Sequence, residues 1–398
     1  MFSSSWSTFL SYWLKAMKLP PRLKGILKQS PLAPVYYHFK RYSLRYEFAK
    51  VCFWLASTRE PVTVSLRKYG RFSPYLFLAL SRAGCRLEID DRFFYFAEVG
   101  ALLRKNRIPI LSTKNIYENA SKKILLYDHD SMNQSTGWRK EVRLNYDYYS
   151  ARSKENAIVM PYFLHPHAYI SGVFAKLPKL RKKQRHIRFF FAGTYNEEAY
   201  TKDFHFPMLN RFQIIRQIMS DFSDEILLLN EKGLISEFLR SENRKPIVMA
   251  LSEDRANTLN KFLLPYEDYI QLLSESFFFL AAPGVSIPHS HNAIEAIALG
   301  TIPVLNYANY GWTPALEHGK NCIAFSNQDE LRARVNEVLS FPERDILEMQ
   351  ANVQDYYETY LKPESFASRL LAHPEPSLTL YVNAEDETAR LYARHQHH

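Results

Sequence analysis

A loop rich in hydrogen-bonding side chains is the part of this sequence best suited to chemistry. It lies between Phe277–Ala282, an apolar run typical of a buried strand, and a short helical pattern that ends at Gly300. A second strand-like run, Ile302–Leu305, follows the glycine. The polar side chains of this segment are Ser286, His289, Ser290, His291, Asn292 and, three residues further along the helix, Glu295.

Strand, loop, helix and strand in this order form a βαβ unit, which places the loop at the N-terminus of the helix. Free backbone N–H groups and the helix dipole favour negative charge there, and an open α/β sheet binds ligands at the same edge. We interpret the loop as the phosphate or ribose site of a nucleotide-activated donor. The structural alternative is that Asn292 and Glu295 form a capping box and that His289 and His291 are ordinary surface histidines.

The run PHSHNAIEAIALGTIPVL resembles the donor-site segment in the C-terminal domain of GT-B glycosyltransferases, where a Glu precedes a small-residue helix and a G-x-I-P-V strand. It is similar to the exostosin-like pattern S-x-R-x-x-E-A followed by G-x-I-P-V, with Asn292 where that pattern has Arg. The His-Asn form is more similar to bacterial surface-polysaccharide transferases, in particular the retaining β-Kdo transferases of glycosyltransferase family 99. The GT-B likeness spans residues 60–370 in outline.

This resemblance implies an α/β protein of GT-B architecture, in which two Rossmann-like domains face each other across a cleft. It implies a metal-independent glycosyltransferase without a cofactor, whose partners are a nucleotide sugar and a glycan or glycolipid acceptor. In the family 99 form the donor is CMP-β-Kdo, and Kdo is added with retention to a bacterial surface polysaccharide (lipopolysaccharide O-antigen or capsule). The alternatives are a UDP- or GDP-sugar donor, or a non-catalytic relative that binds a glycan or nucleotide.

Composition is consistent with a two-domain globular protein. The chain has 398 residues, of which 46% are hydrophobic and 23% charged. Its formal net charge of +10 favours an anionic partner. Three widely separated cysteines, Cys52, Cys85 and Cys322, fit neither a disulfide framework nor a metal site, which favours a reducing cytoplasm.

Residues 1–58 read as a helical, basic arm that packs on the first domain. Trp6, Leu10 and Trp13 recur at helical spacing and make an apolar stripe, which Lys15 and Lys18 border. The stripe either rests on the anionic inner face of the cytoplasmic membrane or packs on the protein itself. No apolar run approaches the ~20 residues that a membrane-spanning helix needs, so we expect a cytoplasmic protein, peripheral at the membrane at most.

A first strand–helix series predicts the acceptor domain, residues 59–175. The turn after its first strand carries Arg67, Lys68 and Arg71, which are candidates for binding the acceptor or a sugar carboxylate, or are solvated loop charges. A later strand ends in Asp128-His129-Asp130, and another ends near His165. An acceptor hydroxyl needs a general base, for which Asp128, Asp130 and His165 are candidates. The Asp-His-Asp triplet alone is a weak metal motif.

A basic run, residues 176–188, contains seven Lys or Arg residues and predicts a solvated interdomain linker. It lacks the interleaved aromatic residues of a nucleic-acid site, so nucleic acid is not an expected partner. A second strand–helix series, residues 189–355, then predicts the donor domain, and helices in residues 356–398 cross back to the first domain. By analogy with GT-B proteins, the turn at Gly193 and Thr194 borders the donor.

The carboxylate that a double displacement requires has its candidates at the end of the second strand of the donor domain, Asn230 and Glu231. Asn230 itself is not a nucleophile, whereas an aspartate at this position would be. An Asp→Asn substitution made to trap a complex would produce the asparagine found here. Glu231 is the nearest carboxylate, with a simple loop charge as the alternative. Dehydrogenases, NTPases, esterases and metalloproteases are disfavoured, because the chain lacks G-x-G-x-x-G, P-loop, G-x-S-x-G and H-E-x-x-H motifs.

Overall fold

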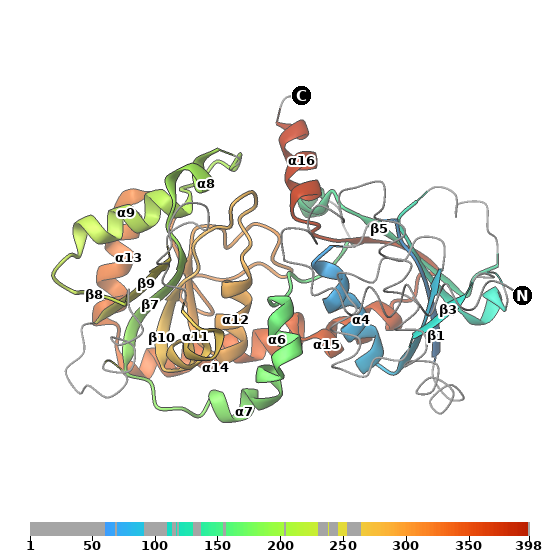
Figure 1. The fold of residues 1–398 in the computed structure, drawn as a ribbon, viewed down its shortest axis with the longest axis horizontal. Helices are drawn as coiled ribbons and strands as arrows, with labels where there is room; N and C mark the ends of the chain where they lie inside the picture. Colours follow the sequence, from blue (N-terminus) through green and yellow to red (C-terminus); the bar gives the residue numbers. More distant parts are fainter. Residues whose placement is uncertain are drawn as a thin grey trace, which may run out of the picture. The chain divides into compact units, whose positions relative to one another are not determined.

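The computed structural model describes residues 60–67, 70–90, 110–113, 117, 119–129, 137–153, 157–202, 204–229, 238, 246–252 and 264–396. The chain divides into two compact units, Met1–Glu141 and Val142–His398 (Figure 1). Each contains parallel strands with accompanying helices, so the predicted α/β class is confirmed. The predicted boundaries 59–175, 189–355 and 356–398 remain predictions.

In the first unit, β1 (Glu60–Ser65) is the central strand. It pairs in parallel with β2 (Cys85–Asp90) and with β4 (Ile124–Tyr127). β2 in turn pairs in parallel with β3 (Ile110–Thr113). The apolar helix α4 (Phe72–Arg82) connects β1 to β2 and is buried along most of its length, as expected for a crossover on a parallel sheet.

Six strands form the main sheet of the second unit, in the order β12-β11-β10-β7-β9-β8. Their bounds are β7 (Ile187–Thr194), β8 (Ile226–Leu228), β9 (Ile247–Ser252), β10 (Ser276–Leu280), β11 (Ile302–Leu305) and β12 (Ile323–Ala324). β7 comes first along the chain but lies in the middle of the sheet, between β9 and β10. Along the chain, β8 and β9 are therefore added on one side of β7, and β10, β11 and β12 are then added on the other. This reversal is a topological switch point, beside which open α/β sheets bind their ligands.

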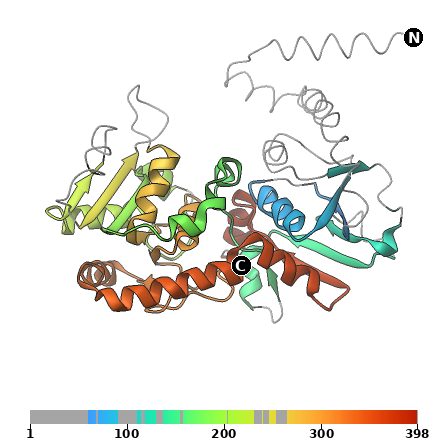
Figure 2. The same ribbon diagram turned by 90° about the horizontal axis from the view of Figure 1, so that it is seen from below.

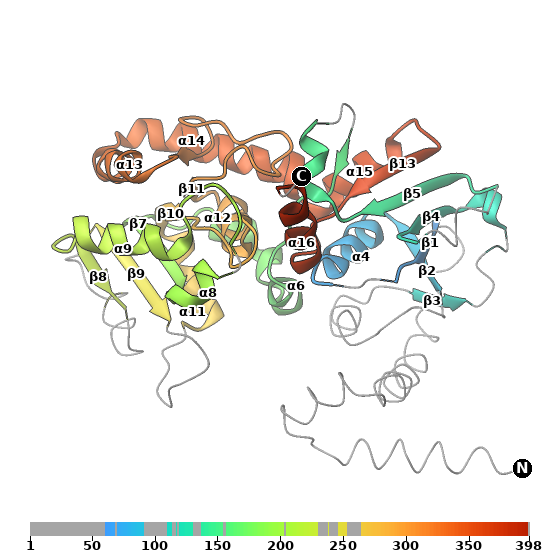
Figure 3. The same cartoon turned by 90° about the horizontal axis from the view of Figure 1, so that it is seen from above.

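The helices of this sheet are α8 (Glu197–Thr201), α9 (Arg211–Asp221), α11 (Tyr266–Ser274), α12 (His291–Leu299), α13 (Gln328–Ser340) and α14 (Glu343–Tyr356). Figures 2 and 3 show α13 and α14 along one side of the strands. α12 is buried from Ala293 to Leu299 and ends, as the sequence predicts, at Gly300, whose φ of 73° favours glycine.

The remaining elements of the second unit precede and follow this sheet. They are η3 (Tyr148–Ser153), β6 (Ile158–Val159), α6 (Pro166–Ser171), η4 (Val173–Lys176), α7 (Leu177–Leu180), η5 (Tyr357–Leu361), α15 (Pro363–Ala372), β13 (Ser377–Tyr381) and α16 (Asp386–His395). β6 and β13 pair in parallel. The short η1 (Ala120–Lys122) belongs to the first unit. Strand β5 (Lys140–Asn145) begins in the first unit and ends in the second.

The basic run 176–188 lies inside the second unit, and its arginines are not the solvated charges that we predicted. Arg181 donates to the carbonyl oxygen of Ala298 at 2.8 Å, and Arg185 donates to that of Leu299 at 2.6 Å. Arg188 donates to the carbonyl oxygen of Val338 at 2.7 Å. The last carbonyls of a helix lack partners within that helix, and these guanidinium groups supply them.

Several predicted features lie outside the described residues. They are the arm 1–58, Lys68, Asp130, Asn230 and Glu231. Within the described ranges, none of the helices combines the length and the apolar character that crossing a bilayer requires.

Candidate functional site

The second unit contains a pocket of about 520 Å³ at the carboxyl ends of β7 and β9. It therefore opens beside the topological switch point, at the sheet edge where open α/β folds bind their ligands. Its lining comes from β7, α6, α9, β9, α11 and α12 and includes His165, His167, Gly193, Thr194, Arg211, Ser252, Tyr266, Tyr269, Asn292 and Glu295.

The glycine turn that was predicted to border the donor lines this pocket. A Cβ at Gly193 would lie 3.2 Å from Nη1 of Arg211 and 3.0 Å from Cζ of Phe191. The absence of a side chain therefore gives the guanidinium room to approach the strand end. The neighbouring Thr194 Oγ1 lies 3.4 Å from the Oγ of Ser252, across β7 and β9.

Arg211, which the sequence analysis did not single out, is the buried cation of the pocket. It is 7% exposed, at the start of α9, where Asn210 and Gln213 form a capping box. Its Nε donates to the carbonyl oxygen of Pro283 at 2.8 Å, and its Nη1 to the hydroxyl of Tyr200 at 2.6 Å. Nη2 donates to the carbonyl oxygen of Ala282 at 3.3 Å.

These three acceptors are uncharged, and a guanidinium has five N–H donors, so two donors remain beyond the bonds within the described residues. Burying a cation that has no anion beside it is costly. A ligand phosphate in the pocket would provide the missing charge and accept hydrogen bonds from the guanidinium. The Asn-Arg-x-Gln capping pattern was visible in the sequence, but a capping pattern gives no indication that its arginine faces a pocket.

Glu295 is a buried carboxyl group on the same pocket wall, 2% exposed. Burial raises its pKa to about 7, against the opposing effect of the hydrogen bonds that it accepts. Tyr266 donates its hydroxyl to Oε1 of Glu295 at 3.1 Å, and burial also raises the pKa of Tyr266. Glu295 is thus poised to change its protonation state when a ligand brings new hydroxyl donors.

The capping alternative for Asn292 and Glu295 is wrong. The N-cap of α12 is Ser290, whose side chain makes no capping hydrogen bond. Asn292 instead donates from Nδ2 to the carbonyl oxygen of Ala192 at 2.9 Å. This bond ties the first turn of α12 to the end of β7, so both sides of the pocket are held at a fixed spacing.

His289 lies in the core and is not part of the pocket lining. It is 2% exposed, and its Nδ1 lies 3.1 Å from the hydroxyl of Tyr149. The rings of Tyr148, Tyr162, Tyr307 and Trp312 surround it. Burial lowers its pKa to about 3, so it is a neutral side chain at physiological pH rather than a surface histidine.

Three further residues of the predicted loop, Ser286, Ser290 and His291, also do not line the pocket. Ser290 is 7% exposed and Ser286 is half-buried. His291 is tied to the preceding segment, because its Nδ1 lies 2.9 Å from the carbonyl oxygen of Phe163 and its ring stacks on Tyr162. Of the eight predicted donor residues, the structure therefore brings Gly193, Thr194, Asn292 and Glu295 together in one pocket.

His165, a predicted general base, lines the same pocket. It is exposed, and it caps α6 by accepting a hydrogen bond from the backbone N–H of His167 at its Nδ1, at 3.2 Å. His167 also lines the pocket, with its ring edge against Tyr266 at 4.9 Å between centroids. Sequence spacing did not distinguish His167 from a loop histidine.

In the first unit, the predicted base Asp128 and the predicted acceptor residue Arg67 follow strands β4 and β1, and Arg71 precedes α4. Asp128 follows β4 and accepts a hydrogen bond from the backbone N–H of Arg67 at 2.7 Å. Arg67 and Arg71 are exposed. The Ser65 hydroxyl, missed by the sequence analysis, donates to Asp90 at 2.7 Å and lies 3.0 Å from Nε2 of His129.

Among the described residues, no group of three or more His, Cys, Asp or Glu side chains has an arrangement that could hold a metal ion.

Comparison with known proteins gives no family assignment by sequence. No family model matches the chain, and no curated protein matches it. Solved structures with a similar chain trace include HepE of Anabaena in complex with UDP, at 13% identity and a TM-score of 0.43 over 78% of this chain and 98% of that one.

A glycosyltransferase from Rickettsia africae matches at 9% identity, with a TM-score of 0.44 over 79% of this chain and 97% of that one. An E. coli structure described as trehalose-6-phosphate bound with UDP-2-fluoro glucose has 9% identity and a TM-score of 0.42, over 79% and 98% of the two chains. Similarity at this level does not identify an activity, so the chemistry has to be inferred from the residues of the site.

Proposed function

We propose that this protein is a glycosyltransferase of GT-B architecture that transfers a sugar from a nucleotide-activated donor to a glycan or glycolipid acceptor. The observation that carries the proposal is Arg211, a buried guanidinium with two N–H donors beyond its bonds to the described residues, in a pocket at the switch point of a parallel sheet. The resemblance of the α12 segment to GT-B donor sites supports the same assignment.

The phosphate of the donor lies against Arg211 and the glycine turn in this proposal. Transfer breaks the bond between the anomeric carbon and a phosphate oxygen, and the leaving phosphate keeps the electron pair. A cation already held in place by the carbonyl oxygens of Ala282 and Pro283 stabilises that charge without rearranging during the reaction. Gly193 allows the approach because it has no side chain.

The ribose lies against Glu295 and Tyr266. An ionised carboxylate accepts hydrogen bonds from ribose hydroxyl groups, and the Tyr266 hydroxyl keeps the Glu295 side chain in one orientation. Because burial raises the pKa of Glu295 to about 7, ribose hydroxyl groups that donate to the carboxylate should favour release of its proton.

We propose CMP-β-Kdo as the donor and retention as the stereochemical course. Arg211 is the one arginine or lysine among the described residues that line the pocket, which suits a donor with a single phosphate better than a diphosphate. The His-Asn form of the α12 segment also supports a Kdo donor. UDP- and GDP-sugars remain the alternative donors.

The acceptor would be a growing bacterial surface polysaccharide, such as an O-antigen or capsule chain. The acceptor hydroxyl must lose a proton as the glycosidic bond forms, and Asp128 and His165 are the proposed bases. Retention by double displacement also requires a carboxylate that attacks the anomeric carbon, for which Glu231 is proposed, or an aspartate at position 230 in place of Asn230. Arg67, Lys68 and Arg71 are proposed to bind the acceptor or the Kdo carboxylate. A peripheral location at the inner membrane face would depend on residues 1–58.

Calorimetric titration with CMP, UDP and GDP tests the proposal. We expect CMP to bind, and Arg211→Gln and Arg211→Lys to weaken binding by about ten- to a hundredfold, because a charge-assisted hydrogen bond contributes about 1.5–3 kcal/mol. Arg344→Gln is the control, since its side chain is 95% exposed and lies outside the pocket. Circular dichroism checks that each variant folds.

The outcomes distinguish the alternatives. Preference for UDP or GDP would replace the Kdo donor but keep the transferase. Tight binding of CMP with no release of CMP from CMP-β-Kdo, in the presence of a lipopolysaccharide or capsule acceptor, would favour the non-catalytic relative. Failure of all three nucleotides to bind the wild-type protein would contradict the proposed site.

A further inference from the structure

A second cavity of about 460 Å³ lies on the second unit, outside the donor pocket. It is bounded by α8, by one face of α9 and by Gln328 at the start of α13. Its volume is within the range of ligand-binding sites. Its lining is mainly polar, with hydroxyl, amide and charged side chains and one aromatic residue, Phe212.

The face of α9 that lines this groove is a continuous stripe along the helix. Its residues are Phe212, Gln213, Arg216, Gln217, Ser220 and Asp221. Residues three or four positions apart lie one above the other on successive turns of a helix. The stripe therefore extends over nearly the whole of α9, a length of about 14 Å at 1.5 Å per residue. A groove of this form suits an extended ligand better than a compact one.

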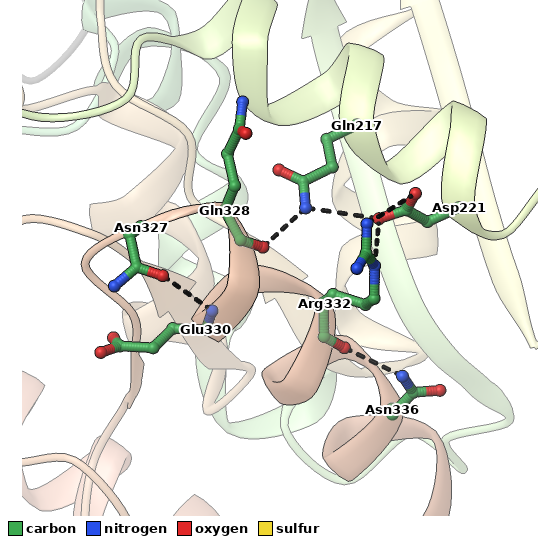
Figure 4. Close-up of polar contacts among 7 residues, drawn as sticks. All are labelled: Gln217, Asp221, Asn327, Gln328, Glu330, Arg332 and Asn336. Atoms are coloured by element: carbon green, nitrogen blue, oxygen red, sulfur yellow. Dashed lines mark hydrogen bonds and ion pairs between the residues drawn. The ribbon is translucent and has the colours of Figure 1, made fainter.

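The charges in the groove exclude a strongly anionic ligand. Glu197 and Asp221 bring two carboxylates and Arg216 one guanidinium. Asp221 is already paired with Arg332, at 2.8 Å between Oδ2 and Nε, and this pair lies at the α13 end of the groove (Figure 4). In the described part of the chain, no carboxylate pairs with Arg216. A nucleic acid would meet two carboxylates matched by two guanidinium groups, and so no net positive charge to bind its phosphates.

The amide of Gln217 is fixed rather than free to adapt. Its Nε2 donates to the carbonyl oxygen of Gln328 at 2.6 Å and to Oδ2 of Asp221 at 3.3 Å (Figure 4). α9 and the start of α13 are therefore held at a constant separation. A groove wall that is already held in place reduces the entropy cost of binding.

The groove and the donor pocket are lined by neighbouring residues of α9. Arg211 lines the pocket, and the next residue, Phe212, lines the groove. Tyr195, which follows the pocket residue Thr194, stacks on Phe212 with 5.0 Å between ring centroids and 17° between planes. This ring pair joins a lining residue of the groove, Phe212, to the chain neighbour of a lining residue of the pocket.

We propose that this groove binds an extended saccharide chain, with Arg216 placed to meet a carboxylate on one of its sugars. Hydroxyl, amide and guanidinium groups spaced along a rigid helix can hydrogen-bond the regularly spaced hydroxyls of a polysaccharide, and nearly balanced charge suits a neutral or weakly acidic chain. The inference rests on the proposed transferase function, because it gives the growing glycan a second contact on the unit that binds the donor.

Calorimetry with two defined hexasaccharides tests the groove. We expect maltohexaose and a maltohexaose derivative with one glucuronate in place of a glucose both to bind the full-length protein. Ser220→Trp fills the groove from its exposed helix face and should weaken both by at least about tenfold. Arg216→Ala should weaken binding of the glucuronate-containing hexasaccharide by about tenfold and that of maltohexaose by less than about threefold, because only the first carries a carboxylate.

Arg344→Trp and Arg344→Ala are the matched controls, because this side chain is exposed on α14 and outside both cavities. The groove proposal is overturned if neither hexasaccharide binds, or if Ser220→Trp binds them as the wild type does, which would locate saccharide binding elsewhere. Titration of CMP separates the two proposals. CMP binding that persists while saccharide binding is absent removes only the groove, whereas saccharide binding without any nucleotide binding removes the proposed transferase site.

Discussion

Tyr266 and Glu295 meet at the wall of the pocket, where the phenolic hydroxyl donates to the carboxyl Oε1 at 3.1 Å. Tyr266 begins α11 and Glu295 lies in the middle of α12, so this hydrogen bond joins the two helices. Neither group reaches bulk water freely, and burial raises the pKa of each. The pair is therefore sensitive both to pH and to any ligand that offers hydrogen bonds.

Glu295 should make the stability of the protein depend on pH in an unusual direction. Its pKa is raised on folding from 4.5 to about 7, so between these values the folded state holds a proton that the unfolded chain releases. The free energy of unfolding should therefore fall as pH rises through this window, by about 3 kcal/mol from this residue. Urea unfolding of the wild type and of Glu295→Gln from pH 4.5 to 8 measures the effect.

In that comparison, Glu295→Gln should show a flatter profile, because glutamine does not ionise. Equal slopes for both proteins would contradict the assignment. The same residue predicts that nucleotide binding at pH 7 releases a proton. Calorimetry in buffers with different ionisation enthalpies should detect this release in the wild type and not in Glu295→Gln.

Gly193→Ala should reduce nucleotide affinity while leaving the fold intact. The new methyl group would lie 3.2 Å from Nη1 of Arg211 and 3.0 Å from Cζ of Phe191, so the guanidinium would have to shift by a few tenths of an ångström. We expect CMP to bind about tenfold more weakly, with thermal stability changed by only a few degrees. Unchanged affinity would show that Arg211 does not hold the phosphate.

Gly311→Ala should destabilise the core around His289. Its φ is 67°, and a Cβ would lie 2.5 Å from both Cε1 of His289 and Cε1 of Tyr148. Backbone strain and overpacking together should cost about 2–5 kcal/mol. Gly319→Ala is the matched control: its φ is 77°, but the added methyl group meets no atom within 4 Å, so only about 1–2 kcal/mol is expected. Equal losses in urea unfolding would refute the steric argument.

Arg185→Met should destabilise the second unit because it removes donors from buried acceptors. Arg185 donates to the carbonyl oxygens of Leu299 and Ser276 and to the hydroxyl of Thr301. Leaving these acceptors unsatisfied should cost about 3 kcal/mol or more, measured by urea unfolding. The exposed Lys182, in the same basic run, provides the contrast, since Lys182→Met should change stability by less than about 0.5 kcal/mol.

The sequence predicted the parts of the fold that depend on local patterns. The apolar run before the loop, the short helix and its end at Gly300 are all present, because periodicity and a left-handed glycine are encoded by neighbouring residues. The donor loop was located less well. His289 and Ser290 have the same polar character as Asn292, but the aromatic rings that bury His289 come from distant segments, including Tyr149 and Trp312.

The same limitation explains the residues that were missed. Nothing near Arg211 in the sequence indicates that Pro283 and Tyr200 will surround it, because these contacts depend on the folding of distant or intervening segments. The basic run 176–188 was interpreted as solvated because charge alone predicts exposure. Its arginines are instead matched to carbonyl oxygens at the ends of helices more than a hundred residues away in sequence, such as that of Leu299.

The strand order of the second unit has a consequence for the time at which this unit can fold during synthesis. β8 lies at the edge of the sheet and pairs with β9, not with β7, which precedes it. When β8 leaves the ribosome, the strand that will hold it has yet to be made. At about 5–20 residues per second, the chain between the two strands takes about one to several seconds to emerge. Throughout that interval, β7 lacks both of its eventual neighbours, so a newly made chain presents an apolar, unpaired strand to chaperones before the donor pocket can form.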